Sequence, residues 1–185
     1  MIRFIVSKKN YLLSVVKIKV LAFFGFAYIG KNCRFDQKAV FDFDGMNNSS
    51  LLILGNNTHI KKYAIIAPRS GKIKIGSNVN INPYCFLYGY GDITIGNFCR
   101  IAAGCKLIAF NHNFSDKEVL IANQGNSRKG IIIGNNVWLG ADVKVLDGVT
   151  IGSNTIVGAG SVVTKSLPSN VVASGVPAQI KRLIE

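Results

Sequence analysis

Aliphatic residues recur at every sixth position over most of the chain. Glycine often follows the aliphatic, and the position four residues beyond it is small or β-branched. The clearest series near the C-terminus consists of Ile133, Leu139, Val145, Ile151, Val157 and Val163. Two shorter series consist of Ile75, Ile81 and Leu87, and of Ile95, Ile101 and Leu107, with weaker versions beginning at Leu54 and Ile29. Regular recurrence of this kind indicates an architecture built from internal repeats.

Each six-residue unit predicts a short strand followed by a turn. The aliphatic side chain points inward, the small residue lies where the interior is narrow, and glycine relieves backbone crowding near the corner. Three such strands close a triangle, and stacked triangles bury a continuous apolar column that no single coil could bury alone. We therefore expect an all-β fold, a parallel β-helix of hexapeptide repeats over residues 29–167.

The two ends of the chain depart from the repeat. Residues 1–28 form an apolar, basic N-terminal segment, in which Lys17 and Lys19 interrupt the apolar run 11–29 and leave it short of a transmembrane span. Plain packing and contact with a membrane surface both remain open for it. No clear signal-peptide cleavage site follows, so we expect a cytoplasmic protein. Residues 168–185 predict a last strand, a turn and a short helix that caps the prism.

The repeat is interrupted once, at residues 110–130, where a polar stretch replaces it. Long excursions from a regular framework are often binding loops, and we expect this one to leave the prism at a corner. His112 lies at its root, where the last coil still fixes its position. An exposed loop histidine is the ordinary interpretation. The location at the break, and the presence of only 2 histidines in the chain, favour a functional role.

Charge and cysteine content restrict the partners. The chain of 185 residues carries a formal net charge of +13, but no nucleic-acid-binding motif accompanies it, so we expect no nucleic-acid partner. Basic residues also suit a phosphate-rich co-substrate, a sugar nucleotide or an anionic membrane. Each of the 4 cysteines lies four residues after an aliphatic of the repeat, in the small inward position. This placement argues against disulfides and against a metal site.

The stretches 133–152 (I-G-N-N-V-W-L-G-A-D-V-K-V-L-D-G-V-T-I-G) and 158–178 (G-A-G-S-V-V-T-K-S-L-P-S-N-V-V-A-S-G-V-P-A) resemble the hexapeptide-repeat O-acetyltransferases. These include the maltose, galactoside and nodulation-factor enzymes and those of capsule, O-antigen and colanic-acid clusters. The resemblance implies a left-handed prism, acetyl-CoA as co-substrate, a sugar or polysaccharide-precursor hydroxyl as acceptor, and a homotrimer with active sites between subunits. The first half of the chain shares only the hexapeptide rhythm.

The resemblance also implies roles for two residues at the reacting centre. His112 corresponds to the catalytic base, and an imidazole suits this role because it titrates near neutral pH and can accept the proton of a hydroxyl. The backbone N–H of Ala141, where relatives often have serine, corresponds to the donor that stabilises the oxyanion. We expect direct transfer in a ternary complex, since no cysteine is placed to accept the acyl group.

Further roles follow from the same resemblance. Asn82 and Asn111 correspond to acceptor contacts, although Asn82 also fits a corner position that tolerates an unusual backbone conformation. The cofactor contacts implied are Trp138 along the pantetheine arm, with Ala159, Thr164, Lys165 and Arg182 toward the nucleotide end. Gln179 replaces an arginine of some relatives, so that Lys181 or Lys129 would supply the charge.

Other functions remain open at this stage. An antibiotic O-acetyltransferase of the streptogramin or chloramphenicol type also has a functional histidine at the loop. A serine or amino-sugar acetyltransferase is a third candidate. A non-enzymatic scaffold would leave the loop and Trp138 without a role. A zinc-dependent carbonic anhydrase would need three histidine ligands, and the chain has 2 histidines. The basic N-terminal segment favours polysaccharide acceptors, which are assembled at membranes.

Overall fold

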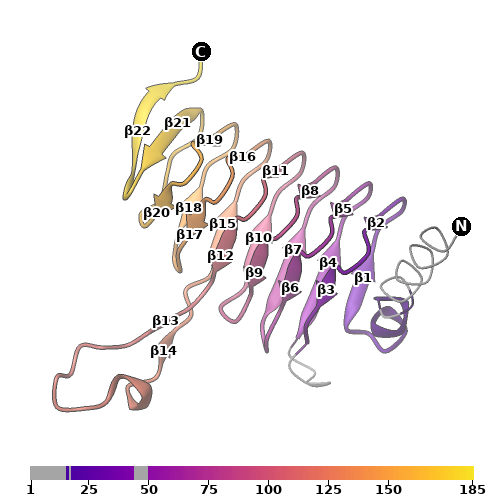
Figure 1. Cartoon of the computed structure of the whole chain (residues 1–185), viewed down its shortest axis with the longest axis horizontal. Helices are drawn as coiled ribbons and strands as arrows, with labels where there is room; N and C mark the ends of the chain where they lie inside the picture. Colours follow the sequence, from indigo (N-terminus) through magenta and orange to yellow (C-terminus); the bar gives the residue numbers. More distant parts are fainter. Residues whose placement is uncertain (1–15, 17, 44–49) are drawn as a thin grey trace, which may run out of the picture.

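The protein forms a triangular prism of parallel strands from which one long arm projects (Figure 1). The structure is a computed structural model that describes residues 16, 18–43 and 50–185. The chain passes through sheets A, B and C in turn in each coil, so that neighbouring strands of a sheet come from successive coils. This arrangement confirms the all-β, hexapeptide-repeat β-helix that the sequence predicts.

The strands are short, as a six-residue repeat requires. Sheet A contains β1 (Ala27–Ile29), β4 (Leu51–Leu54), β7 (Lys72–Ile75), β10 (Ile93–Ile95), β15 (Ile131–Ile133) and β18 (Thr150–Ile151). Sheet B contains β2 (Arg34–Phe35), β5 (His59–Ile60), β8 (Asn80–Ile81), β11 (Arg100–Ile101), β16 (Trp138–Leu139), β19 (Ile156–Val157), β21 (Val171–Gly175) and β22 (Ala178–Leu183). Sheet C contains β3 (Val40–Phe41), β6 (Ile65–Ala67), β9 (Phe86–Tyr88), β12 (Lys106–Ile108), β17 (Lys144–Val145) and β20 (Val162–Val163).

The interior is the aliphatic column that the repeat predicts. Every aliphatic of the three series is buried, and the parallel register places like on like, as in Ile81 beside Ile101 and Ile101 beside Leu139. Burying one such side chain is worth about 1.5–3 kcal/mol. Stacking of identical coils is therefore the main source of stability in this fold.

Several of the small inward positions hold short polar or sulfur side chains that bond to the next coil, and the others hold alanine or valine. Thr155 Oγ1 donates to the carbonyl of Pro168 at 2.9 Å. The thiol of Cys99 donates to the carbonyl of Gly134 at 3.1 Å, and that of Cys105 to Gly140 at 3.1 Å. Cys85, Cys99 and Cys105 are buried, Cys33 is half-buried, and all four thiols are free. These residues join the coils where a larger side chain would not fit.

The three edges of the prism are the turns that join one sheet to the next, called here edges AB, BC and CA. Edge AB has a left-handed backbone residue in each of seven turns, and six of them are asparagine, which tolerates this conformation; Phe98 is the exception. Edge BC has Lys38, Tyr63 and Tyr84 at the equivalent position of its first three turns, with φ between 62° and 63°. Such a conformation costs a non-glycine residue roughly 1–2 kcal/mol. Stacking of two aromatic side chains, as between Tyr63 and Tyr84, offsets about 0.5–1.5 kcal/mol of this cost.

The C-terminal segment differs from the prediction, because residues 178–183 form a strand and not a short helix. β22 runs antiparallel to β21 and extends sheet B. Eight residues are too few for a stable helix, whereas pairing satisfies the open edge of β21. Lys181 and Arg182 on the new outer strand discourage further pairing with another chain.

The N-terminal segment is described only from residue 16, and residues 1–15 and 17 lie outside the described part. Residues 18–23 are helical and lie against the first coil, where Ile18 and Leu21 join the core. The same helix leaves Phe23 85% exposed and Phe24 56% exposed. Within the described residues, no helix is both long and apolar enough to span a membrane.

Candidate functional site

The arm leaves the prism at edge CA, between β12 in sheet C and β15 in sheet A (Figure 1). It contains β13 (Asn111–His112), a 3₁₀ turn η1 (Ile121–Asn123) and β14 (Asn126–Ser127). β13 and β14 pair in antiparallel fashion, with Asn111 opposite Ser127 and His112 opposite Asn126. This pairing turns an irregular loop into a ribbon that holds His112 at a defined point near its base.

Asp147, in the next turn of edge CA, anchors the returning strand of the arm. Its carboxylate accepts hydrogen bonds from Ser127 Oγ at 2.7 Å, from the Lys129 N–H at 3.1 Å and from the Gly130 N–H at 2.8 Å. Sequence reasoning missed this residue, because its partners lie 17 to 20 positions away, across the break in the repeat. Asp147 therefore fixes the arm to the prism.

A chain of aromatic rings supports His112 from the other side. The His112 ring lies edge-on to Phe110 at a centroid distance of 5.8 Å. The ring centroid of Phe110 lies 5.0 Å from that of Tyr88 and 5.8 Å from that of Tyr90. The guanidinium of Arg128 covers Tyr90 at 3.5 Å and donates to its hydroxyl. These rings restrict the imidazole without using either of its nitrogens.

The arm encloses an open cavity of about 610 Å³ on the side of His112. Asn111, Asp116, Gln124 and Lys129 line it together with His112. Within the described chain, the His112 imidazole makes no hydrogen bond and the residue is exposed. Both ring nitrogens therefore remain open to a substrate that enters this cavity.

Edge BC carries the second group of expected site residues. Ala141 and Ala159 occupy successive turns of this edge, and both are exposed. The Ala141 carbonyl accepts from Gly160 N at 2.7 Å, while its own N–H has no acceptor within the described residues. Trp138, 53% exposed, lies on the strand that leads into this turn. A free N–H beside an exposed indole and small residues fits a thioester carbonyl and its extended chain.

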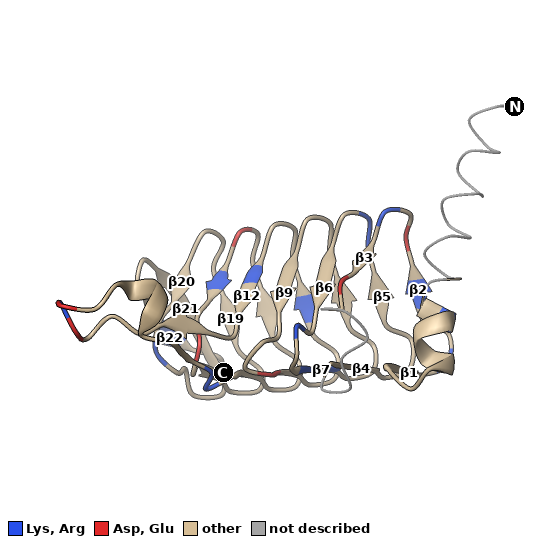
Figure 2. Ribbon diagram, turned by 90° about the horizontal axis from the view of Figure 1, so that it is seen from below, with Lys and Arg blue, Asp and Glu red and all other residues tan. Residues whose placement is uncertain are grey.

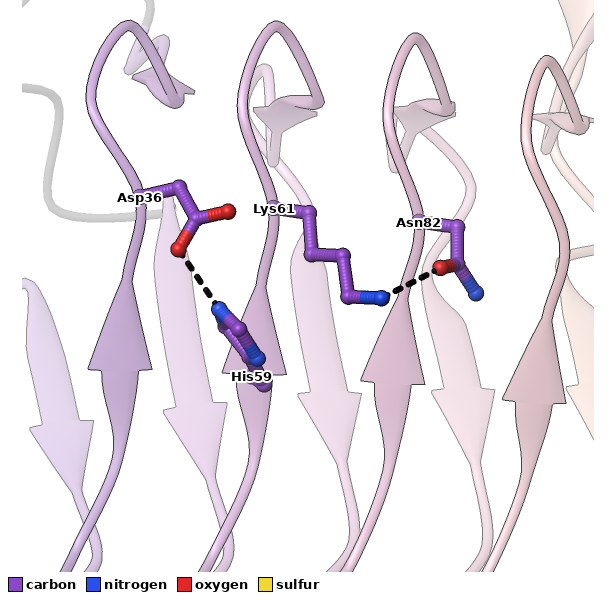
Figure 3. A network of polar contacts seen from close by, with 4 residues as sticks. All are labelled: Asp36, His59, Lys61 and Asn82. Atoms are coloured by element: carbon purple, nitrogen blue, oxygen red, sulfur yellow. Dashed lines mark hydrogen bonds and ion pairs between the residues drawn. The ribbon is translucent and has the colours of Figure 1, made fainter.

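Asn82 belongs to the same edge, two turns before Ala141. Its amide oxygen accepts from Lys61 Nζ at 2.8 Å (Figure 3). Its amide nitrogen donates to the carbonyl of Ile101 at 2.8 Å. These two hydrogen bonds give Asn82 a structural role in its turn, and they also fix the position of the Lys61 ammonium group. The sequence did not single out Lys61.

The residues expected at the nucleotide end are divided between two parts of the prism. Thr164 and Lys165 lie on edge CA after β20, whereas Arg182 lies on the outer strand β22 of sheet B. All three are exposed. The structure therefore groups His112, Asn111, Thr164 and Lys165 along edge CA. It groups Asn82, Trp138, Ala141 and Ala159 along or beside edge BC.

The titratable sulfur groups lie in the core, away from both edges. Burial raises the pKa of the Cys99 thiol, and the interaction with the neighbouring Cys105 thiol together with burial raises the pKa of Cys85. Such thiols stay protonated and are poor nucleophiles. Within the described residues, no three histidine, cysteine or acidic side chains are grouped to hold a metal ion.

Comparison with known proteins relates this geometry to acyltransferases. Residues 130–165 match the bacterial transferase hexapeptide (six repeats) family. The galactoside O-acetyltransferase of Escherichia coli (strain K12) is 41% identical over 112 residues, 60% of this chain and 54% of that enzyme. The galactoside O-acetyltransferase of Lactococcus lactis is 38% identical over 112 residues, 60% of this chain and 53% of the other. The chain thus matches about half the length of these relatives.

Solved structures extend the similarity over most of the prism. AntD, an N-acyltransferase from Bacillus cereus in complex with dTDP and 3-hydroxybutyryl-CoA, superposes with a TM-score of 0.75 at 26% identity, covering 90% of this chain and 88% of AntD. A galactoside acetyltransferase in complex with coenzyme A gives a TM-score of 0.58 at 29% identity, covering 85% and 64%. The chain thus shares the β-helix fold of these acyltransferases, and residues 130–165 match their hexapeptide-repeat family.

Proposed function

We propose that the protein transfers an acetyl group from acetyl-CoA to a hydroxyl of a sugar or polysaccharide precursor, with His112 as general base. The observation that carries the proposal is the position of His112. The imidazole of His112 packs against Phe110 at the break of the repeat, and Asp147 anchors the strand of the arm that pairs with it. Neither of its nitrogens has a hydrogen-bond partner among the described residues. The similarity to galactoside O-acetyltransferases supports the choice of donor and acceptor.

The reaction follows from these groups in one ternary complex. His112 takes the proton of the acceptor hydroxyl as its oxygen attacks the thioester carbonyl carbon. The Ala141 N–H stabilises the oxyanion of the tetrahedral intermediate, the carbon–sulfur bond breaks, and the imidazolium returns the proton to the thiolate of CoA. General-base help is worth about 100- to 10,000-fold, and an oxyanion donor about 100- to 1,000-fold.

The division of the site between two edges supports a homotrimer. Sheet C lies between edges BC and CA, and its outward face carries Val40, Ile65 and Phe86 on its first three strands. The arm exposes the apolar side chains of Phe114 (76%) and Leu120 (74%) at its outer end, which suits their burial against a neighbouring subunit. Association around sheet C brings His112 of one subunit to Ala141 and Trp138 of the next. A stable, fully active monomer in analytical ultracentrifugation contradicts this assembly.

A peripheral contact with the inner face of the cell membrane accompanies this function. The helix at residues 18–23 exposes Phe23 and Phe24 around Lys19, a combination suited to an anionic lipid interface. Binding to vesicles that contain phosphatidylglycerol, and its loss in Phe23→Asp, checks the contact. Equal pelleting of both proteins contradicts it.

N-acylation of an amino sugar is the second candidate. It is favoured by the structural similarity to AntD, an N-acyltransferase, because the superposition covers 90% of this chain. The two reactions need the same base and the same oxyanion donor, and they differ in the acceptor atom. Treatment of the product with hydroxylamine separates them, because an ester is cleaved and an amide is not.

The decisive experiment compares the protein with His112→Ala and with Asn113→Ala, a matched change in the next residue of the arm. We expect His112→Ala to lower single-turnover acetyl transfer several-hundred-fold, at the scale of general-base catalysis, while the affinity for CoA is unchanged. Asn113→Ala should retain most of the activity. A loss of less than tenfold in His112→Ala removes this residue from the base role.

A further inference from the structure

The first three turns of edge BC carry bulky side chains in a conformation that disfavours them. Lys38, Tyr63 and Tyr84 have φ values of 62°, 62° and 63°. The equivalent positions of later turns are held by Gly104, Asp142 and Gly160. Glycine or asparagine is the usual occupant of such a position, and strained backbone at bulky residues tends to mark a functional surface. This surface lies between the N-terminal helix and the turn of Ala141.

Lys38 and the two tyrosines form a continuous exposed strip. Lys38 Nζ donates to Tyr63 Oη at 3.1 Å and lies 5.2 Å from the ring centroid. Tyr63 and Tyr84 are stacked at 5.1 Å with only 5° between their planes. Tyr84 is 61% exposed and Tyr63 is 36% exposed. Because Tyr63 Oη accepts from Lys38, its own proton is free to be donated to a ligand.

Lys61 adds an ammonium group that no acid neutralises. Within the described residues its recorded partner is the neutral amide of Asn82, at 2.8 Å. The nearby carboxylate of Asp36 is already paired with His59 Nε2 at 2.7 Å. Figure 3 shows the two pairs side by side on successive coils. Lys61 is only partly exposed, so its uncompensated charge is held in a fixed place.

The charge is concentrated at one end of the edge. Figure 2 shows blue turns between sheets B and C close to the N-terminal helix, with red beside the first of them, and tan turns farther along this edge before a red one. Asn82, which holds the Lys61 ammonium, is two turns from Ala141. At about 4.8 Å between strands, this places the ammonium on the order of 10 Å from the oxyanion donor. That separation accommodates one sugar ring and a phosphate attached to it.

We propose that the acceptor is a sugar phosphate or diphosphate whose phosphate groups bind Lys61, Lys38 and the Tyr63 hydroxyl. The inference rests on the proposed acyl transfer and specifies its substrate. Ammonium and phenol donors spaced along an edge fit the several oxygens of a diphosphate. The reacting hydroxyl then points along edge BC toward Ala141, and the phosphates lie on the opposite side of the ring.

A binding experiment tests the site without any turnover. Isothermal titration with inorganic pyrophosphate compares the protein with Lys61→Met and Tyr63→Phe, which keep the bulk of each side chain. We expect affinity to fall at least tenfold in Lys61→Met and severalfold in Tyr63→Phe. Lys74→Met is the matched control, because Lys74 is exposed on β7 in sheet A. Equal affinity in Lys61→Met and Lys74→Met overturns the proposal.

Kinetics then identify the substrate and its source. The same hexose is supplied as acceptor in five forms. These are the free sugar, the corresponding uronate, the sugar 1-phosphate, the nucleoside diphosphate sugar and the polyprenyl diphosphate sugar. We expect a phosphorylated form to exceed the free sugar at least tenfold in kcat/KM, with this advantage lost in Lys61→Met and the KM for acetyl-CoA unchanged. The better of the last two forms shows whether the phosphate comes from a nucleotide or a lipid. Preference for the free sugar or the uronate overturns the inference.

The two proposals fail in different ways. If no acceptor is acetylated although CoA binds, the proposed function is wrong, and the pyrophosphate titration still decides the anion site. If the free sugar is acetylated as well as its phosphate, the proposed function stands and the inference is wrong.

Discussion

The prism and the arm are ordered by different kinds of interaction. In the prism, identical coils bury aliphatic side chains completely, and each coil repeats the contacts of the last. In the arm, no residue between 111 and 130 is buried. Its order comes from the Asp147 carboxylate, from the rings beneath His112, and from Gln124, whose amide joins Asp116 and Val119 across the loop. Stability therefore resides in the prism and the proposed general base in the arm, so substitutions should separate the two.

The largest expected effect on stability lies in the prism. Leu139 is fully buried at the centre of sheet B, so Leu139→Ala should lower the free energy of unfolding by about 2–5 kcal/mol, since its neighbours cannot collapse into the space. Ile121→Ala in the arm, where the side chain is 57% exposed, should change it by less than about 0.5 kcal/mol. Urea unfolding measures both, and similar values for the two variants would contradict the division.

Asp147→Ala should uncouple the arm from the prism. Loss of the three hydrogen bonds to Ser127, Lys129 and Gly130 lets His112 move, and misplacement by 1 Å can cost about 100-fold in rate. We expect turnover to fall about 10- to 100-fold with little change in unfolding, and amide exchange to quicken in β13 and β14. Glu118→Ala, at an exposed position of the arm, is the matched control. Unchanged amide exchange in Asp147→Ala would count against the anchoring role.

Lys165→Ala tests whether edge CA takes part in cofactor binding. If Lys165 contacts a phosphate of CoA, the KM for acetyl-CoA should rise severalfold, because one charge-assisted contact is lost. Acetyl-dephospho-CoA should then be affected less. Lys117→Ala, at an exposed position of the arm, is the control. Equal losses for both thioesters would exclude a contact with the phosphate that dephospho-CoA lacks.

The smallest effect concerns the buried thiol of Cys99 in the prism. Burial raises its pKa, so the folded state keeps the proton that an unfolded thiol releases near pH 8.5. The stability that this group contributes is complete below the unfolded pKa and declines as pH rises beyond it. Urea unfolding at pH 7 and pH 9.5 should show a larger decline for the protein than for Cys99→Ala. Identical declines would contradict this linkage.

The sequence predicted the prism because the same information is repeated in every coil. A departure from the pattern at one position, such as Phe98 in place of asparagine on edge AB, does not obscure a repeat that many other positions share. The arm was located by the absence of the pattern, but its ribbon, the Asp147 anchor and the Arg128–Tyr90 contact depend on single pairs far apart in sequence. The C-terminal strand was mistaken for a helix because its pairing partner, β21, is what determines it.

The division of the candidate site between two edges was also outside the reach of motif reasoning. Between His112 and Trp138 lie the rest of the arm and β15, so His112 is on the ribbon at edge CA whereas Trp138 is in sheet B. Counting strands in threes from the break would have placed His112 at edge CA and Ala141 at edge BC. The contacts of Lys61 could not be found in this way, because they depend on side-chain directions across coils.

Sheet A keeps an unbroken register across the coil that carries the arm, because β10 before the arm pairs directly with β15 after it. Ile93 pairs with Ile131 and Ile95 with Ile133, as if the intervening residues were absent. The prism therefore closes regardless of what is inserted between β12 and β15. This junction is a natural graft point, where loops of other lengths and sequences can be exchanged to test the proposed role of the arm in acceptor choice while edge BC, the proposed thioester site, is left intact.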